Sequence, residues 1–552
     1  MIADIHITEK SFGDKTLMKD VKFSVDDGEK VGVVGRNGVG KSTLFGILSG
    51  KDTDYTGEVI FRRGITVATT AQEHHGLGDQ TVMSYILGGL PEYSKLKKII
   101  DEYPLTMGDN MRKIEEYTQA LERFDQKGFY QVEEKIEREL SKFQLDGYGN
   151  RRISSLSGGQ KRLVEIVKIM HSEAHLALID EPTNHMDYVA KQQFIDWMNS
   201  QPHQAMLIIT HDRDVLGQVD RIVEIKDGQA VSYRGNYDAY LKQNAQATTA
   251  GMNNFEQIEK RIVNLKQKVL DYQRLKEKSR NPGTIQKFKR LENEARAELA
   301  ELSEMEKPTF WIDKESASQL DYKSAERYGK FKSRNIRLSM KDASSRSQHV
   351  LVRAENVAVG IGEWILFEDV NIDLREGEAI EIRGRNGAGK TTLIRMILAS
   401  GKSFDGGPIL YSGDIFLDPQ VRIGVYEQEI DERYLSDPLE KAIEKLYMSR
   451  DLSISDTKIR QLLADYLFTD ADRMTPLARL SGGQKARFQI IAMLANDPQL
   501  LVLDEPTNHL DLPSIEELET ALAKYSGAIL YVSHDNYFRE KLGGKVVQIG
   551  AE

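Results

Sequence analysis

Three short motifs occur twice along the chain in the same order, and this repeat limits what the chain can fold into. A glycine-rich run comes first, Leu-Ser-Gly-Gly-Gln follows, and Asp-Glu-Pro-Thr-Asn-His comes third. The second and third motifs are equally spaced in both copies, which predicts one domain type written twice. The paired runs are 35–42 and 384–391, 156–160 and 480–484, and 180–185 and 504–509.

The first copy is longer than the second. The glycine-rich runs are 349 residues apart, whereas the two later motifs are 324 residues apart, so the first copy carries about 25 extra residues. The excess lies at about 90–130, where lysines and glutamates recur at helical spacing. This insertion is either a longer helical subdomain or a docking arm, and the sequence favours neither.

A segment near 246–348 matches neither copy. Apolar side chains at 255, 258, 262, 265, 269 and 272 step by three and four residues, which is typical of a coiled-coil seam. The turn signal at 281–283 precedes a second stretch with helical spacing, so we expect an antiparallel helical hairpin whose first helix covers about 255 to 278. The predicted domains are 1–245, 246–348 and 349–552.

Each glycine-rich run has the context of a phosphate-binding loop. It follows a short apolar strand and precedes a helix-compatible stretch, and its glycines let backbone N–H groups close around phosphate oxygens. Lys41 and Lys390 would neutralise the β- and γ-phosphates of ATP, and Ser42 and Thr391 would offer a hydroxyl to Mg²⁺. The expected nucleotide-binding residues are Gly35, Arg36, Asn37, Gly38, Val39, Gly40, Lys41, Ser42 and Thr43, and Gly384, Arg385, Asn386, Gly387, Ala388, Gly389, Lys390, Thr391 and Thr392.

Paired carboxylates begin the third motif. Asp180 and Asp504 end apolar runs typical of buried strands, a position from which a carboxylate helps to hold Mg²⁺. The next residues, Glu181 and Glu505, are expected to face the γ-phosphate and to act as general bases. For any one of them the alternative is a helix-capping or ion-pairing carboxylate.

Together these motifs resemble the ATP-binding-cassette proteins, and specifically the ABC-F family. Asp-Glu-Pro-Thr-Asn-His followed by Met186-Asp187 or Leu510-Asp511 resembles the ABC-F form, and Met186 stands where Leu is usual, a volume-conserving change. The resemblance covers essentially the whole chain. It implies two tandem ABC-type P-loop ATPase domains of α/β fold, joined by an antiparallel α-helical hairpin.

The family resemblance also implies a head-to-tail sandwich of the two cassettes. Each ATP would lie between the phosphate loop of one cassette and the Ser-Gly-Gly-Gln signature of the other, which gives two hydrolytic sites in one monomeric chain. The loop at 35–42 would work with Ser481, Gly482, Gly483 and Gln484, and the loop at 384–391 with Ser157, Gly158, Gly159 and Gln160.

Other residue roles follow from the resemblance. Gln72 and Gln428 match the glutamine that meets Mg²⁺ and water, and His211 and His534 match the switch histidine near the γ-phosphate, which makes both histidines candidate catalytic residues. Phe12 matches the aromatic residue that stacks on adenine. The same offset places Ile361 in the second copy, where nearby Trp364 is a possible substitute.

Charge is unevenly distributed. The chain has 75 Lys and Arg against 85 Asp and Glu, a net charge of −10 that by itself argues against nucleic acid as a partner. Residues 260–290, however, carry +9 and residues 323–346 carry +6. A basic hairpin end suits a phosphate-rich partner, and a merely solvated coiled coil is the alternative. The expected RNA-binding residues are Arg274, Lys276, Lys278, Arg280, Lys287, Lys289 and Arg290.

The family resemblance implies that the partner is the ribosome. In ABC-F proteins the linker enters the tRNA exit site and approaches the peptidyl-site tRNA; ATP-bound cassettes stay there, and hydrolysis releases them. We therefore expect a ribosome-associated ATPase that modulates translation, either as a general factor or as an antibiotic-resistance ribosome-protection protein. The compact turn at 280–284 favours the general factor. The alternatives are the soluble ATPase subunit of a transporter and an ATPase that handles DNA.

Composition narrows the setting. The chain has no Cys, which excludes a disulfide-rich scaffold, and no apolar run approaches the ~18–20 residues that span a bilayer. Asp4, His6 and Glu9 argue against a secretory signal at the start. We expect a cytoplasmic protein without a membrane partner.

Overall fold

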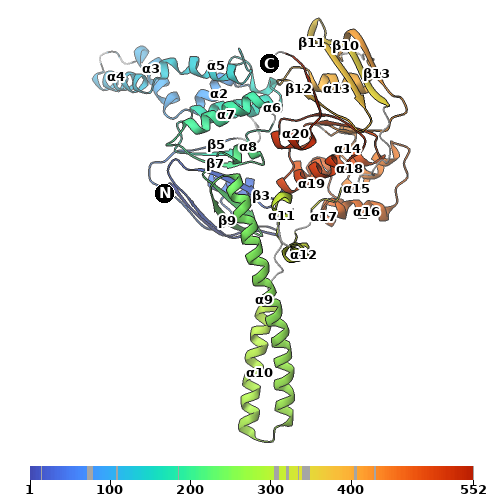
Figure 1. Ribbon diagram of the computed structural model, residues 1–552. Coiled ribbons are helices and arrows are strands. Elements are labelled where there is room, and N and C mark those ends of the chain that lie inside the picture. The colour runs from blue at the N-terminus through green and yellow to red at the C-terminus, as the bar shows by residue number, and fades with distance from the viewer. Residues whose placement is uncertain are drawn as a thin grey trace. The chain divides into compact units, whose positions relative to one another are not determined.

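The computed structural model describes the chain in two compact units. One unit joins Met1–Tyr237 with Ile336–Glu552, and the other is Asp238–Asn335. The described residues are 1–13, 15–70, 79–106, 108, 110–184, 186–303, 310–318, 322–332, 335–338, 349–402, 407–427 and 430–550. The fold is α/β with two cassettes and a long helical hairpin, so the predicted fold class is confirmed (Figure 1).

The first cassette is built on a largely parallel sheet. Its strand order is β5-β6-β7-β3-β8-β9, with only β8 and β9 antiparallel, and every residue of β6 and β7 is buried. Such continuous apolar runs are expected of parallel strands that are covered on both faces. The strands are β3 (Lys30–Gly35), β5 (Val67–Thr69), β6 (Leu176–Asp180), β7 (Ala205–Ile209), β8 (Arg221–Lys226) and β9 (Gln229–Arg234). A separate antiparallel sheet holds β1 (Ala3–Phe12), β2 (Lys15–Val25) and β4 (Thr56–Phe61).

The insertion of the first cassette is helical. Its helices α3 and α4 pack together, and the rings of Tyr93, Phe124 and Phe129 lie 5.3–5.6 Å apart in one aromatic cluster. This agrees with a helical subdomain, and its use as a docking arm stays a prediction. The helices of this cassette are α1 (Lys41–Leu48), α2 (Val82–Gly88), α3 (Tyr93–Thr106), α4 (Met111–Gln126), α5 (Val132–Lys142), α6 (Gly158–His171), α7 (Tyr188–Ser200) and α8 (Arg213–Leu216), with short 3₁₀ turns at Phe129–Gln131 and Ile153–Ser155.

The second cassette repeats this plan. Its parallel sheet has the order β14-β15-β16-β12-β17, and its antiparallel sheet has the order β11-β10-β13. The strands are β10 (Val350–Ile361), β11 (Trp364–Arg375), β12 (Ala379–Arg383), β13 (Ile409–Leu417), β14 (Ile423–Tyr426), β15 (Leu500–Asp504), β16 (Ala528–Val532) and β17 (Lys545–Gln548). The helices are α13 (Lys390–Leu398), α14 (Glu432–Leu435), α15 (Leu439–Met448), α16 (Asp456–Asp465), α17 (Asp470–Arg473), α18 (Gly482–Leu494), α19 (Leu512–Ala523) and α20 (Asn536–Leu542), with a 3₁₀ turn at Leu477–Arg479.

The second unit contains the predicted hairpin. Helix α9 (Tyr237–Lys278) and helix α10 (Pro282–Ser303) lie side by side, and the seam buries Leu265, Val269 and Ala295. Tyr272 and Phe288 also meet on the seam, with ring centroids 6.3 Å apart. The shorter helices α11 (Lys314–Ser318) and α12 (Tyr322–Phe331) follow.

The predicted start of the first hairpin helix, near 255, is wrong because α9 begins at Tyr237. The earlier turns bury Tyr240, Asn244, Thr248 and Met252 at four-residue spacing. The stripe is helical, but two of its members are polar, and Asn244 donates to the Trp311 carbonyl at 2.9 Å. Apolar periodicity alone therefore places the start of this helix too far along the chain.

Candidate functional site

Each glycine-rich loop connects a buried strand to a helix in both cassettes. Gly40 and Gly389 stand just before α1 and α13 with φ of 104° and 97°, a left-handed conformation that disfavours other residues. A Cβ on Gly35 would lie 2.6 Å from the Ile225 carbonyl oxygen, so the first loop also requires glycine at its start. The sequence folds here into a tight turn whose backbone N–H groups precede a helix N-terminus, the arrangement that binds phosphate.

The lysines of the two loops are buried in the same way. Lys41 Nζ donates to the carbonyls of Gly35 and Arg36 at 2.7 and 3.1 Å, and Lys390 Nζ makes the matching bonds in the second cassette at 2.8 and 3.0 Å. Burial lowers the pKa of both lysines from their ordinary value, although nearby carboxylates oppose the shift. An ammonium group removed from water favours an anion, so both sites suit a phosphate group.

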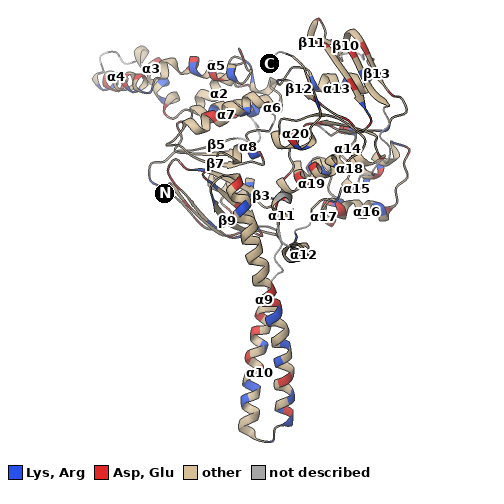
Figure 2. Ribbon diagram, viewed as in Figure 1, with Lys and Arg blue, Asp and Glu red and all other residues tan. Residues whose placement is uncertain are grey.

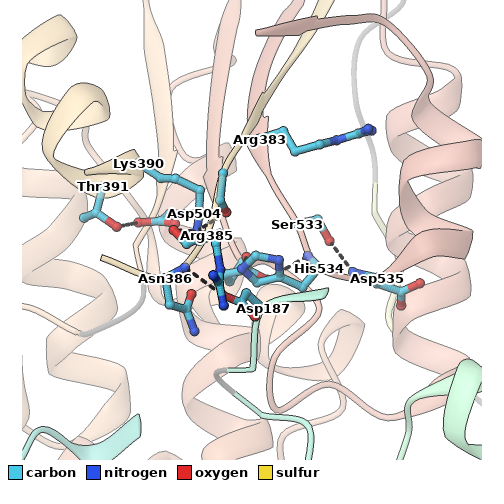
Figure 3. Close-up of polar contacts among 12 residues, drawn as sticks. Asp187, Arg383, Arg385, Asn386, Lys390, Thr391, Asp504, Ser533, His534 and Asp535 are labelled. Atoms are coloured by element: carbon cyan, nitrogen blue, oxygen red, sulfur yellow. Dashed lines mark hydrogen bonds and ion pairs between the residues drawn. The ribbon is translucent and has the colours of Figure 1, made fainter. Parts of the chain in front are cut away.

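The second cassette has the geometry of a magnesium site. Thr391 Oγ1 donates to Asp504 Oδ2 at 2.7 Å (Figure 3), and burial raises the pKa of Asp504. Asp180 is also buried, at the end of β6, and its N–H donates to Thr70 at 3.1 Å. The described residues contain no cluster of three or more acidic, His or Cys ligands. Mg²⁺ fits such sites, since it takes one or two protein oxygens and completes its shell with phosphates and water.

Glu181 and Glu505 are held in strained backbone positions. Their φ angles are 47° and 51°, in the left-handed region, and their N–H groups donate to Ile209 and Val532 carbonyls at 2.7 and 3.0 Å. Such strain persists only where the surroundings hold it, and it concentrates at functional sites. The same departure in both copies therefore supports both glutamates as candidate catalytic residues.

Each glutamate lies beside its predicted histidine. His211 Nε2 is 3.3 Å from Glu181 Oε1, and His534 Nε2 is 3.2 Å from Glu505 Oε1. Burial, with the neighbouring aspartate, raises the pKa of Glu181 to about 8 and that of Glu505 to about 7. Burial lowers the pKa of both histidines to about 3, so each ring is neutral near pH 7.

Several buried polar atoms at these sites lack a hydrogen-bond partner within the described part of the chain. Among them are Glu505 Oε1 and both ring nitrogens of His211, because the short His534–Glu505 and His211–Glu181 distances do not meet hydrogen-bond geometry. Buried polar groups are normally satisfied, so these atoms indicate a missing partner such as a water, a phosphate or a hydrated metal ion. ATP with Mg²⁺ therefore fits the donors and acceptors of these two sites.

A cavity of about 600 Å³ lies over the first phosphate loop. The second cassette contributes Ser481, Gly482 and Gly483, and a Cβ on Gly483 would lie 2.1 Å from Asn37 Nδ2. Only glycine permits this approach. The lining includes Asn37, Gly38, Gly40, Lys41, Ser42, Thr43, Asp180, Glu181 and His211 from the first cassette, together with Gly158, Lys161 and Arg162 of α6.

The signature serines and glutamines cap their own helices. Ser157 accepts from the Gln160 N–H at 3.3 Å while Gln160 Oε1 accepts from the Ser157 N–H at 3.0 Å, and Ser481 with Gln484 does the same. This capping box fixes the entry to α6 and α18. Of the first signature, Gly158 lines the cavity over the phosphate loop of its own cassette. The second phosphate loop is contacted from the first cassette by Asp187.

Asp187 and Asp511 are functional candidates that the sequence reasoning did not select. Asp187 caps α7 and accepts from the Asn386 N–H at 2.9 Å, and Asp511 caps α19 and accepts from the Asn37 N–H at 3.0 Å. Each aspartate thus joins the third motif of one cassette to the phosphate loop of the other (Figure 3 shows Asp187 and Asn386). The signal was present in the sequence, because both follow the repeated third motif at the same spacing.

The remaining predicted residues lie in three settings. Phe12 is 56% exposed with Lys10 Nζ 4.7 Å from its ring centroid, and its counterpart Ile361 and nearby Trp364 are also exposed. Gln72 and Gln428 lie outside the described residues. Val39, Gly387, Ala388 and Thr392 belong to the two loops or the helix starts that follow them.

The predicted RNA-binding residues of the hairpin differ in exposure. Lys276 donates to Glu292 at 2.6 Å, and Arg290 pairs with Glu294 at 2.9 Å, so these two cations already have acidic partners within the hairpin. Glu292 itself is buried. Basic and acidic side chains are therefore mixed along the hairpin, as the colours of α9 and α10 in Figure 2 show. Six of the seven residues are exposed, Arg274, Lys278, Arg280, Lys287, Lys289 and Arg290, and Lys276 is half-buried.

A family profile described as "ABC transporter" matches residues 18–184 and 367–508, more than half of the chain and both copies of the repeat. The chain is also 30% identical to the putative ATP-binding protein YdiF of Bacillus subtilis, over 100% of this chain and 80% of that protein. The chain belongs to the ATP-binding-cassette family, as an ABC-F protein. The family resemblance drawn from the motifs is confirmed.

Two further relatives of this ABC-F protein have names that refer to translation. The ribosome protection protein VmlR of Bacillus subtilis is 27% identical, over 96% of this chain and 83% of VmlR. The energy-dependent translational throttle protein EttA of Mycobacterium tuberculosis is 27% identical, over 96% of this chain and 88% of EttA.

The solved structures support the fold of this ABC-F protein. The archaeal ribosome recycling factor aABCE1, solved with the stalk protein aP1, aligns with a TM-score of 0.58 and 16% identity over 99% of this chain and 87% of that chain. Across the described residues, no helix has the length and apolar character that a membrane crossing needs.

Proposed function

We propose that this ABC-F protein hydrolyses ATP at two composite sites, each completed by the opposite cassette. The observation that carries this proposal is the pair of reciprocal bonds from Asp187 to the Asn386 N–H and from Asp511 to the Asn37 N–H. These bonds join each phosphate loop to the other cassette. A γ-phosphate bound at either loop would therefore touch both cassettes and favour their closure.

The residues of each site have defined roles in this proposal. The loop N–H groups and Lys41 or Lys390 hold the phosphates, and bound Mg²⁺ would neutralise charge on the β- and γ-phosphate oxygens, held by Ser42 with Asp180 or by Thr391 with Asp504. Glu181 and Glu505 act in their ionised forms, in which they orient the attacking water and take its proton. His211 and His534 are neutral and lie beside those side chains, a position from which they would face the γ-phosphate.

We also propose that the ATP-bound form acts on the ribosome through the hairpin. Two observations support this proposal. Relatives that span almost the whole chain are named for ribosome protection and for translational throttling, and the hairpin end carries six exposed cations. In this proposal the hairpin enters the tRNA exit site near peptidyl-site tRNA, and hydrolysis releases the protein. This role takes one of two forms. The first is that of a general translation factor, and the second is that of an antibiotic-resistance protein that protects the ribosome; the name of VmlR refers to ribosome protection.

The test uses a chain that binds ATP without hydrolysing it. The double variant Glu181→Gln, Glu505→Gln should sediment with ribosomes in the presence of ATP and Mg²⁺, and should remain in the supernatant without nucleotide. DNA and phospholipid vesicles serve as the competing partners. Sedimentation with DNA or vesicles but not with ribosomes would overturn the translational proposal.

Charge reversal then locates the contact on the hairpin. Changing Lys278, Arg280, Lys287 and Lys289 to Glu in the double variant should weaken ribosome binding at least ~10-fold at physiological salt, because each lost phosphate contact removes counterion release. ATP binding should be retained. The matched control reverses four exposed cations of the second cassette, Lys458, Arg460, Lys524 and Lys545. Equal loss in both sets would show that overall charge, and not the hairpin, governs binding.

A further inference from the structure

The two composite sites differ in the helices that follow Asp187 and Asp511. Helix α7 carries Lys191 four residues after Asp187, whereas α19 carries Ile515 at the same place after Asp511. The repeat is therefore broken at one position that faces the opposite cassette. The first cassette has a cation at this position, Lys191, and the second cassette has an apolar side chain, Ile515.

Lys191 makes a buried polar connection to the second cassette. Only 5% of its side chain is exposed, and Nζ donates to Asp214 Oδ2 at 2.5 Å and to the His534 carbonyl at 3.0 Å. Asn536 Nδ2 donates to the same Asp214 oxygen at 2.8 Å. The loop that carries His534 is thus held from both ends by side chains of the first cassette.

This connection reaches the candidate catalytic groups. Lys191 shares a small cavity of about 50 Å³ with Glu505 and His534, and with Glu181 and His211 of the first site. Burial alone would lower the pKa of Lys191, but Asp212 and Asp214 raise it, so the ammonium stays charged. A charged donor on a carbonyl makes a stronger and more directional bond than a neutral one.

The first site has a different connection. Arg213 Nη1 donates to Glu519 Oε1 at 2.9 Å, one helical turn beyond Ile515 on α19, and both side chains are buried. In the second site Asn536 stands in the place of Arg213, and Ile195 stands in the place of Glu519. That ion pair joins α8 to α19 and bonds no atom of His211, so the two switch histidines are supported by unlike contacts.

We propose that Lys191 is a positioning residue acting across the cassette interface, which sets His534 beside Glu505 and so controls hydrolysis at the second site only. The proposal rests on the two hydrolytic sites proposed above. It makes the two sites inequivalent: the second becomes fully ordered only when the first cassette delivers Lys191, whereas the first has Ile515 in that place.

The test isolates each site by removing the other. In a Glu181→Gln background only the second site turns over ATP, and in a Glu505→Gln background only the first does. In the Glu181→Gln background, where the second site works alone, Lys191→Met should lower kcat about 10-fold, since small misplacements of catalytic groups cost this much or more. The KM for ATP should change little, and Lys191→Arg should restore most of the rate. In the Glu505→Gln background, where the first site works alone, Lys191→Met should lower the rate by less than about twofold.

Other outcomes overturn the proposal in distinct ways. Equal losses in both backgrounds would mean that Lys191 only holds the cassettes together. An unchanged second-site rate would mean that it positions nothing. If Glu181→Gln abolishes turnover altogether, no separately working second site exists and the proposal fails. Absence of ATP hydrolysis in the unsubstituted chain would instead refute the proposed function itself.

Discussion

ATP turnover is expected to fall by about 10²- to 10⁴-fold when Glu181 and Glu505 are both changed to Gln, the range that a positioned general base contributes. Gln keeps the size of the side chain but cannot take a proton from water. Each glutamate lies beside a histidine and is held at a strained φ angle, and the side chains of Glu181 and Glu505 are only 19% and 7% exposed. Steady-state phosphate release measures the loss.

A buried glutamate outside the sites provides the control for this variant. Glu165 on α6 is fully buried and accepts a hydrogen bond from Tyr85, so Glu165→Gln tests the effect of removing a buried carboxylate as such. It should leave turnover nearly unchanged, while the double Gln variant should still bind ATP. Unchanged turnover in Glu505→Gln alone would remove the second site from the mechanism.

Removing one partner of the Arg213–Glu519 pair is expected to cost about 3–5 kcal/mol of stability, because the other charge is left buried and unpaired. Each side chain is 7% exposed, and the pair joins α8 of the first cassette to α19 of the second. Glu519→Ala should therefore clearly lower the urea concentration at the midpoint of the first unfolding transition. Replacing both residues by Met removes both charges and should recover most of the loss.

The exposed pair Arg290–Glu294 is the matched control for this ion pair. Its side chains are 81% and 56% exposed, and such pairs along a helix contribute only about 0.3–0.5 kcal/mol. Glu294→Ala should leave the midpoint almost where it was. If Glu519→Ala behaves like Glu294→Ala, the pair does not stabilise the packing of α8 against α19.

The sequence predicted those parts of the site that are fixed by local pattern. A glycine-rich loop ending in Lys41 specifies its own turn, and an apolar strand ending in Asp180 places that carboxylate at the edge of the sheet, so both appear where expected. The hairpin was predictable in the same way, because the spacing of its apolar residues and the turn signal at 281–283 are also local patterns. These are short-range features, and the repeat shows the glycine-rich loop and the strand-end carboxylate twice.

Features that depend on tertiary contact were not predictable in this way. Asp187 stands at a repeated position after the third motif, but its bond with the Asn386 N–H depends on how the two cassettes pack, which the sequence does not show. Lys191 looks like an ordinary surface lysine in sequence but is buried against the switch loop of the other cassette. Lys276 is one of the predicted RNA-binding residues, but it donates to Glu292 across the seam, a contact that the sequence alone does not show.

Exchange of signature variants tests most directly whether each site draws its signature from the other cassette. In a Glu181→Gln background, where Glu505 alone drives hydrolysis, Ser157→Arg should abolish ATP turnover, whereas Ser481→Arg should reduce it by only a few-fold. The Glu505→Gln background should give the opposite order. If Ser481→Arg silences Glu505 while Ser157→Arg spares it, each cassette works with its own signature and the reciprocal account is wrong.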